Sequence, residues 1–549
     1  MTVAEIMRCA NLARKAAVAF LLLSLAIFVF GCWPNSNPEL DGSTLNRGLI
    51  GDPESLDPHK ISSNQSAFVL LDIGEGLTSY GADGAIIPGV ADRWENTSDG
   101  LTYTFHLRQQ ARWSDGSAVT ADDFEFAFKR LVDPETAAPY AQYLSAIENA
   151  LSIANGNQSR EDLSVVAIDK HTLQIRLHTP APHFLQLVAH PSTFPLHQES
   201  FRTLGVESFK PGNYVSNGAY QLVDWTVGSS ISLRRNEAYW ASQTTTIDNV
   251  IFHIVDQNAE FNRYRAREID VTANVPESAL PSLRKERPSE LRVAPYLGVY
   301  YYGFNLVEGL FANNLKLRQA LSMAIDRQAL VDQITGRGEI PAYSWVPPGV
   351  HRYSQQQYDF SNLEKIEREK FARSLFGEAG FELDQGLEFE LRYNTFDGNE
   401  RIALAIQSMW RDVLGVEAKL GNEELKVFID NVRSRENIEA FRLSWTGDYN
   451  DAVSFLQLFK SNNPSNFTGY SSSNFDKTFL LAETEADSDN RKILLEKAER
   501  IAMADYPVIP LYFYVSKHLI SQSVLGWENN VMDIHLSRHL SLHDGTDSP

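Results

Sequence analysis

The chain has 549 residues, and because single hydrophobic cores rarely grow past about 250–300 residues, this length indicates more than one domain. Hydrophobic residues make up 43% and aromatic residues 11%, which is enough for large packed cores and excludes a disordered composition. With 49 Lys+Arg against 70 Asp+Glu, the net charge is −21, which disfavours nucleic acid and anionic membrane surfaces as partners.

The first segment of the chain has the pattern of a secretory signal. Arg8, Arg14 and Lys15 form a basic head, and a run of apolar and small residues, broken only by Ser24, covers 16–30. A helix that spans a bilayer needs about 20 apolar residues, and this run is shorter. The pattern therefore favours a cleaved signal peptide over 1–31, with an uncleaved anchor helix as the alternative.

The signal ends in Val29-Phe30-Gly31-Cys32, which resembles the bacterial lipobox. This resemblance implies cleavage before Cys32 and a lipid on its thiol. Cys9 would leave with the signal, so no free thiol would remain for a disulfide in the exported compartment. Residues 32–44 are polar and rich in Pro, Asn and Ser, which predicts a flexible tether. No later apolar run is long enough to cross a membrane.

Periodic segments in the rest of the chain predict a mixture of strands and helices. Alternating apolar residues predict strands at 102–108 and 172–177, and further β segments are expected at 231–233 and 250–254. Thr120 followed by Asp123 predicts a capped helix that ends at Asp133-Pro134. Later helices are expected at 315–334, 363–379, 400–414 and 491–504. Because strands and helices interleave, the fold class is α/β or α+β.

The motifs of several enzyme classes are missing from the sequence. There is no H-E-x-x-H pair among the 13 histidines, and His178 and His183 flank prolines rather than share a helical face. There is also no G-x-S-x-G elbow and no phosphate-binding G-x-x-x-x-G-K-[ST] loop. Acids such as Asp122 and Asp123 lie at a helix start, where they complement the helix dipole. The sequence predicts neither an enzyme, nor a metal site, nor a cofactor.

A series of blocks points instead to one family. The blocks include Leu56–His59, Pro88–Trp94 and the segments 101–134, 294–306, 317–327, 445–456 and 508–515. In this order they resemble the extracytoplasmic solute-binding proteins of peptide and nickel ABC transporters, and most closely the oligopeptide-binding members. The resemblance covers nearly the whole mature chain.

The resemblance implies a periplasmic-binding-protein fold of type II, which is α/β (mixed α+β). Two lobes are joined by a hinge, and an additional domain is inserted. By analogy, domain I comprises 45–74, 197–297 and 516–549, domain II comprises 75–196, and domain III comprises 298–515. The lobes are expected to close on the ligand through a hinge motion.

A receptor for peptides of varied sequence has to bind what all peptides share, which is an ammonium, a backbone and a carboxylate. A buried carboxylate is the natural partner for the ammonium, because burying that cation unpaired costs several kcal/mol. The resemblance assigns this role to Asp448, in the segment Trp445–Asn450. The alternative is that Asp448 caps a following helix at 452–459.

Other residues are implied to complete the site. The backbone of Ser444, Trp445 and Thr446, together with Asn64, would pair with an added peptide strand, which gives affinity without sequence preference. Tyr140 matches a tyrosine that lines the pocket. Tyr296, Tyr301 and Asn274 are further candidates, and an ordinary place in the core is the alternative for each tyrosine. Wet, roomy side-chain pockets would adapt to different peptides.

The carboxylate end of the peptide is expected near Arg442, with an ordinary ion pair as the alternative. Four positions depart from the family pattern. Asn399 stands where oligopeptide-binding members can carry a histidine, and Leu425 stands in place of a pocket tryptophan. Gly298 and Thr446 occupy the places of a disulfide that some members form. The preferred peptide length is therefore open.

The sequence as a whole predicts a monomeric, exported lipoprotein, periplasmic or at the cell surface. It would capture short peptides and deliver them to the permease and ATPase of an ABC importer. A murein-peptide receptor and a nickel or nickel-chelate receptor of the same fold are alternatives. A lipoprotein chaperone that holds unfolded chains is another, from a different class.

Overall fold

A computed structural model describes residues 42–384 and 386–543 of the chain. The predicted signal over 1–31, the predicted lipid site Cys32 and nearly all of the predicted tether lie outside these residues. Among the described residues, no helix combines the length and apolar character that crossing a membrane requires. Strands and helices alternate along the chain, which confirms the mixed α/β class.

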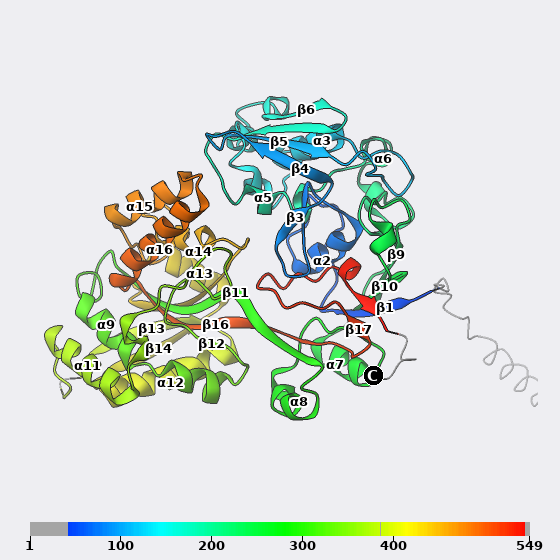
Figure 1. The fold of residues 1–549 in the computed structure, drawn as a ribbon. Coiled ribbons are helices and arrows are strands. Elements are labelled where there is room, and N and C mark those ends of the chain that lie inside the picture. The colour runs from blue at the N-terminus through cyan, green and yellow to red at the C-terminus, as the bar shows by residue number, and fades with distance from the viewer. Residues whose placement is uncertain (1–41, 385, 544–549) are drawn as a thin grey trace, which may run out of the picture. The chain divides into compact units, whose positions relative to one another are not determined.

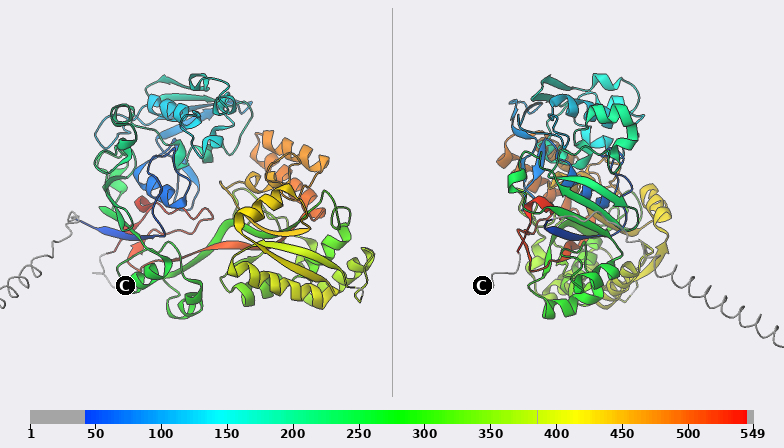
Figure 2. Two further views of the ribbon diagram at one scale, coloured as in Figure 1. Left: turned by 180° about the vertical axis from the view of Figure 1, so that it is seen from behind. Right: turned by 90° about the vertical axis from the view of Figure 1, so that its right-hand side faces the viewer.

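The first sheet joins the start of the described chain to a segment far along the sequence. Its strand order is β1-β10-β9-β8, and β1 runs parallel to β10 whereas the other neighbours are antiparallel. The blue β1 therefore lies beside green strands in both views of Figure 2. The strands are β1 (Thr44–Leu49), β8 (Tyr220–Thr226), β9 (Ser230–Arg235) and β10 (Asn249–Ile254). The β segments expected at 231–233 and 250–254 are confirmed. The helices on this part of the chain are α2 (Asn64–Ile73), α6 (Gln198–Leu204), α7 (Gln257–Arg265) and α8 (Leu280–Glu286).

The second sheet is antiparallel, with the order β4-β5-β7-β6. Its strands are β4 (Ala91–Asn96), β5 (Thr102–Leu107), β6 (Val165–Asp169) and β7 (Thr172–Arg176). The alternation along β5 buries Tyr103, Phe105 and Leu107, as expected. The predicted capping box opens α3 (Ala121–Val132), where the Thr120 amide donates to Asp123 Oδ2 at 2.9 Å. Phe124 and Phe128 of α3 join the buried core with this sheet.

The third sheet has six strands in the order β12-β16-β11-β15-β13-β14. They are β11 (Leu291–Phe304), β12 (Ile340–Pro341), β13 (Glu388–Asn394), β14 (Glu417–Glu423), β15 (Ala440–Thr446) and β16 (Val508–Leu519). The two long strands β11 and β16 pair antiparallel, from Leu291 opposite Leu519 to Gly303 opposite Val508, and run side by side in Figure 1. The chain between them therefore leaves and returns through neighbouring strands.

Three of the four helices predicted after β11 lie where the periodicity places them, and α13 and α15 were not predicted. The helices after β11 are α9 (Leu315–Ala324), α10 (Arg327–Ala329), α11 (Lys365–Glu378), α12 (Asp397–Leu414), α13 (Leu425–Ser434), α14 (Val453–Leu456), α15 (Ser473–Thr484) and α16 (Ser488–Ala504). The predicted helices at 363–379, 400–414 and 491–504 correspond to α11, α12 and α16. Ile402, Ile406 and Trp410 of α12 are buried, so their stripe belongs to the core.

The single helix predicted over 315–334 is wrong, because the chain breaks after Ala324. Ile325 adopts an extended conformation, and Asp326 starts α10 by accepting the Ala329 amide at 3.1 Å. A π-helical turn at Leu330–Thr335 follows. The break turns the fully buried Arg327 inward, where its guanidinium donates to the carbonyls of Pro510 at 2.8 Å and Ser322 at 2.9 Å. These hydrogen bonds compensate the buried charge of Arg327. A continuous helix would not point the Arg327 side chain toward these carbonyls.

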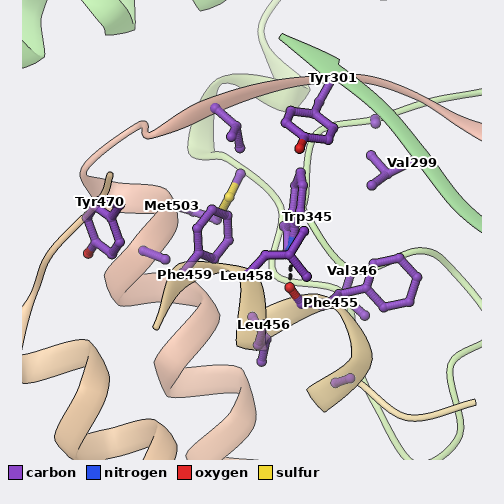
Figure 3. Close-up of a cluster of buried hydrophobic side chains, with 14 of the residues drawn as sticks. Val299, Tyr301, Trp345, Val346, Phe455, Leu456, Leu458, Phe459, Tyr470 and Met503 are labelled. Atoms are coloured by element: carbon purple, nitrogen blue, oxygen red, sulfur yellow. Dashed lines mark hydrogen bonds between the residues drawn. The ribbon is translucent and has the colours of Figure 1, made fainter. Parts of the chain in front are cut away.

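A large aromatic cluster lies between the third sheet and helices α14 and α16 (Figure 3). Its centre is Trp345, which is fully buried and donates from Nε1 to the Phe455 carbonyl at 2.9 Å. The bond satisfies the only polar atom of the indole, so the ring is buried without an unmet donor. The remaining regular elements are short: β2 (Thr78–Tyr80), β3 (Ile86–Pro88), β17 (Val524–Leu525), β18 (Ser541–Leu542), α4 (Ala150–Ala154) and α5 (Phe184–Leu187).

Candidate functional site

Strand β15 has a backbone edge that is open over most of its length. On one side it pairs with β11 from Ala440 to Thr446. On the other side β13 reaches only Ala440 and Phe441. The main-chain groups of residues 442–446 that face away from β11 therefore have no strand partner among the described residues. Such an edge can accept an extended chain as an added strand.

The loop after β15 is fixed by hydrogen bonds that converge on one serine and by close packing. Trp445 Nε1 donates to the Ser454 carbonyl at 2.7 Å, and the Asp448 amide donates to Ser454 Oγ at 3.1 Å. Gly447 donates its amide to the Leu297 carbonyl at 2.8 Å, and a Cβ there would lie 2.8 Å from both Leu297 and Phe455. Glycine therefore lets the loop pack closely, and the loop holds Asp448 in place.

A hollow of about 390 Å³ brings together half of the residues expected at the site. It is lined by Asn64, Tyr140, Tyr296, Thr446 and Asp448, which come from segments far apart in the sequence. We refer to it as the Asp448 hollow. Its volume falls within the usual range for small-ligand sites, about 300–1,000 Å³.

The carboxylate of Asp448 is the unmatched charge of this hollow. Among the described residues it has no cationic partner and accepts no hydrogen bond, although its own amide is bonded to Ser454. The side chain is exposed to the hollow, yet the surrounding protein removes part of its hydration and so raises the pKa of Asp448 above its ordinary value. A cationic ligand group would relieve this cost.

Three rings form a wall of the same hollow. The ring centroids of Tyr140, Tyr143 and His190 lie 4.7–4.8 Å from one another. His190 Nδ1 accepts the Ser192 amide at 3.2 Å, and burial lowers the pKa of His190 to about 3, so the imidazole is neutral. Neutral aromatic faces beside a carboxylate suit an ammonium group. The sequence analysis missed Tyr143 and His190.

The alternative role for Asp448, capping the following helix, is not formed, since the N-cap of α14 is Ala452 and a different aspartate bonds the start of the helix. Asp451 Oδ1 accepts the Val453 amide at 2.9 Å at the start of α14, and the Asp451 carboxylate pairs with Arg491 at 2.8 Å. Asp451 is buried, and burial would raise its pKa, but the Arg491 charge and hydrogen bonds hold the pKa of Asp451 below its ordinary value. Asp448 is therefore free of a capping role.

Tyr301 does not line the Asp448 hollow. Its ring points toward Trp345 in Figure 3, with centroids 4.8 Å apart and planes at 81°. The side chain is 3% exposed and belongs to the core of the third sheet. The structure thus places it in the ordinary core position that the sequence analysis left as the alternative.

Asn274 and Arg442 also lie away from the lining of this hollow. The Asn274 side chain accepts the Val275 amide at 2.8 Å. The Arg442 guanidinium stacks over Tyr300 at 4.3 Å and donates to Asn394 Oδ1 at 3.0 Å. No described carboxylate pairs with Arg442, so the ordinary ion pair expected as its alternative is not formed.

The structure shows what surrounds the positions that depart from the family pattern. Asn399 is buried and accepts a hydrogen bond from the Tyr300 hydroxyl at 3.1 Å. Leu425 is 53% exposed at the start of α13. Gly298 lies opposite Thr446 in the β11–β15 register. A disulfide at these two positions would therefore join neighbouring strands of one sheet.

Comparisons with known proteins agree with this architecture. Residues 85–467 match the model of the bacterial extracellular solute-binding proteins, family 5. The chain is 38% identical over 527 residues to the periplasmic oligopeptide-binding protein OppA of Salmonella typhimurium, covering 94% of this chain and 96% of that protein.

Two solved structures are also similar. The unliganded open form of the periplasmic murein tripeptide-binding protein MppA has a TM-score of 0.86 at 35% identity and covers 91% of this chain and 98% of its own. Haemophilus influenzae OppA in complex with RPPGFSPFR has a TM-score of 0.71 at 34% identity, covering 91% and 99%. With its sheets, its open strand edge and these matches, the chain belongs to the family-5 bacterial extracellular solute-binding proteins.

Proposed function

We propose that this chain is the receptor of an ABC importer and captures short peptides by their N-terminal ammonium and main chain. The observation that carries the proposal is the unpartnered Asp448 carboxylate beside the open edge of β15. An extended peptide that pairs with residues 442–446 would bring its ammonium to Asp448. The names of the similar proteins, which are oligopeptide- and murein tripeptide-binding proteins, support this reading.

The two interactions divide the work of binding. Main-chain pairing along β15 supplies affinity that does not depend on the peptide sequence. Asp448 supplies register, because the N-terminal ammonium has a fixed place at the start of the main chain and matches the charge of the carboxylate. The rings of Tyr140, Tyr143 and His190 would cover the ammonium and exclude water, which strengthens the charge pair.

Calorimetry of the full chain in mild detergent, with tri- to pentapeptides, tests this proposal. Asp448→Ala should weaken binding by up to about 3–5 kcal/mol, or roughly a hundredfold to several thousandfold, because the ammonium would be covered without a partner. Asp412→Ala is the control, since Asp412 is an exposed acid on α12. Acetylating the peptide N-terminus should cost the wild type a similar amount and cost the Asp448→Ala protein little.

The outcomes separate the competing functions. Tight binding of acetylated peptides, unchanged in Asp448→Ala, would favour a chaperone that holds hydrophobic segments. Binding of murein tripeptide but not of linear peptides with free N-termini would favour the murein-peptide receptor. Failure to bind any peptide, together with binding of a nickel chelate, would leave only the fold in common with peptide receptors.

We further infer that the mature chain is a monomer anchored by a lipid on Cys32 and not an enzyme. Support comes from the lipobox-like sequence before Cys32 and from relatives described as periplasmic. Cys32→Ser should release the protein from membranes and remove the acyl mass seen by mass spectrometry. An unchanged membrane fraction would favour an uncleaved N-terminal anchor.

The domain division is also part of the proposal. Domain I comprises 45–74, 197–297 and 516–549, domain II 75–196 and domain III 298–515. Each of the three large sheets lies within one of these groups of residues, apart from the two long strands. The boundaries at 297/298 and 515/516 fall inside β11 and β16, so these strands would form the connection between domains I and III.

A further inference from the structure

Three side chains outside the proposed peptide contacts converge on one point. His518 is in β16, and Asp533 and His535 follow it in the C-terminal segment. Asp533 Oδ1 lies 2.8 Å from His518 Nε2 and 3.2 Å from His535 Nε2. One ligand atom from each residue lies within 4.8 Å of the others. The side chains of the two histidines are 9% and 6% exposed and that of Asp533 is 19% exposed, so this is an enclosed cluster rather than a surface group of acids.

Each member of the cluster is held in orientation by a separate contact. His518 Nδ1 lies 2.8 Å from the Thr272 carbonyl and Nε2 lies 2.8 Å from Asp533 Oδ1. Both oxygens only accept, so both ring nitrogens donate in the metal-free cluster, and an ion would displace the proton on Nε2. The His535 ring stacks on Trp527 with centroids 3.6 Å apart. Asp533 has a φ of 56°, a left-handed conformation that is uncommon outside glycine. Histidines that bind metal ions usually donate the N–H of their other ring nitrogen to a carbonyl or a carboxylate, which fixes the orientation of the ring.

The separations of the three ligand atoms come near those of a tetrahedral ion. Metal–ligand distances of about 2.0–2.2 Å place the ligand atoms of a tetrahedral site about 3.3 Å apart. The observed distances of 2.8 and 3.2 Å are both shorter than this value, so an ion would have to move the histidine nitrogens away from Asp533 by about half an ångström or less. Two imidazole nitrogens and one carboxylate oxygen favour zinc, nickel or copper over magnesium or calcium.

We propose that His518, Asp533 and His535 form a binding site for a divalent transition-metal ion at the wall of the Asp448 hollow. Asp533 lines that hollow, which gives an ion a route of entry. Arg47, a cation beside His535, is engaged elsewhere: it donates to the His535 carbonyl at 2.9 Å and lies 3.7 Å from Asp72. The proposed ligands do not include Asp448, so the test of this site needs no bound peptide.

The test is a titration of the full chain with Zn²⁺, Ni²⁺ and Co²⁺ in mild detergent, after peptide removal. Every sample is treated with N-ethylmaleimide, so that any Cys9 or Cys32 thiol left free by incomplete processing does not bind metal. Calorimetry should show one equivalent bound, and Co²⁺ should give the visible absorption of a low-symmetry, four-coordinate site. His535→Asn and Asp533→Asn should each weaken binding by at least tenfold to a hundredfold, since loss of an outer-shell partner alone costs that much.

The controls separate a built site from adventitious binding. His351→Asn removes an exposed histidine and should leave the affinity unchanged. Circular dichroism checks that each variant is folded, and the metal should raise the melting temperature of the wild type but not that of His535→Asn. The proposal is overturned if the wild type binds none of the three ions. It is equally overturned if both ligand variants keep wild-type affinity, because the cluster would then be only a hydrogen-bonded imidazole–carboxylate group.

Discussion

Asp448 and Asp451 lie three residues apart in one loop, and their surroundings are opposite. Asp451 is buried, pairs with Arg491 and accepts the amide that begins α14. Asp448 is exposed to a hollow and has no partner among the described residues. The same side chain thus stabilises the fold at one position and keeps its binding capacity for a ligand at the other. An unmet charge in a preformed hollow marks a site more clearly than the residue type does.

The largest expected effect comes from a substitution of Asp451, the aspartate that stabilises the fold. Asp451→Asn should lower the free energy of unfolding by about 3–5 kcal/mol, because it leaves the nearly buried Arg491 guanidinium without its carboxylate. Asp448→Asn should change the free energy of unfolding little. Urea denaturation of the two variants and the wild type measures the difference. Equal losses of stability in both variants would contradict the division of roles between these aspartates.

The pH dependence of binding sharpens the comparison. Only the ionised Asp448 can pair with an ammonium, and loss of hydration raises its pKa in the free protein. Peptide affinity should therefore reach its maximum above that raised pKa and fall about tenfold for each pH unit below it. The decline should begin at a higher pH than it would with an ordinary aspartate. His190, with a pKa of about 3, stays neutral over most of this range.

C-terminally amidated peptides suit this measurement, because their own carboxyl group does not titrate. Calorimetry of the wild type between pH 3 and 7 should give the decline, and Asp448→Asn should bind weakly with a flat profile. Asp451, whose pKa is lowered by Arg491, stays ionised to a lower pH and should not contribute to the decline. A wild-type affinity that is constant down to pH 4 would argue against a charge pair with Asp448.

The smallest effect concerns a residue that the family resemblance suggested. Tyr301→Phe should leave peptide affinity within about 0.5 kcal/mol of the wild type, because the side chain packs on Trp345 in the core rather than in the hollow. Tyr140→Phe is the matched variant, since Tyr140 does line the hollow. If Tyr301→Phe weakened binding more than Tyr140→Phe, the hollow described here would not be the whole site.

Local signals in the sequence were sufficient for much of the fold. The capping box of Thr120 and Asp123 and the alternation along β5 depend on neighbouring residues, and both predictions are confirmed. The predicted helix over 315–334 failed because its break at Ile325 serves a distant contact, the bond from Arg327 to the Pro510 carbonyl. Periodicity carries no information about such a contact.

The site residues likewise divide into those that the sequence identified and those that it could not identify. The family resemblance selected Asn64, Tyr140, Tyr296, Thr446 and Asp448, which the structure brings together in one hollow. It could not separate them from Tyr301, because alternate residues of a strand face opposite sides and the burial of each side depends on packing. The cluster of His518, Asp533 and His535 carries no motif, because its first ligand comes from a strand and the other two from a later segment.

The pairing of β11 with β16 makes the intervening chain a replaceable unit. Gly303 and Val508 lie opposite each other, and residues so paired in antiparallel strands are only about 4.5–5.5 Å apart. A two-residue turn could in principle join them, so the segment between could be exchanged for that of a relative without a long linker. Because that segment carries β15 and Asp448 whereas Asn64 and Tyr140 stay behind, such a chimera would combine the ligand edge of one receptor with the pocket wall of another.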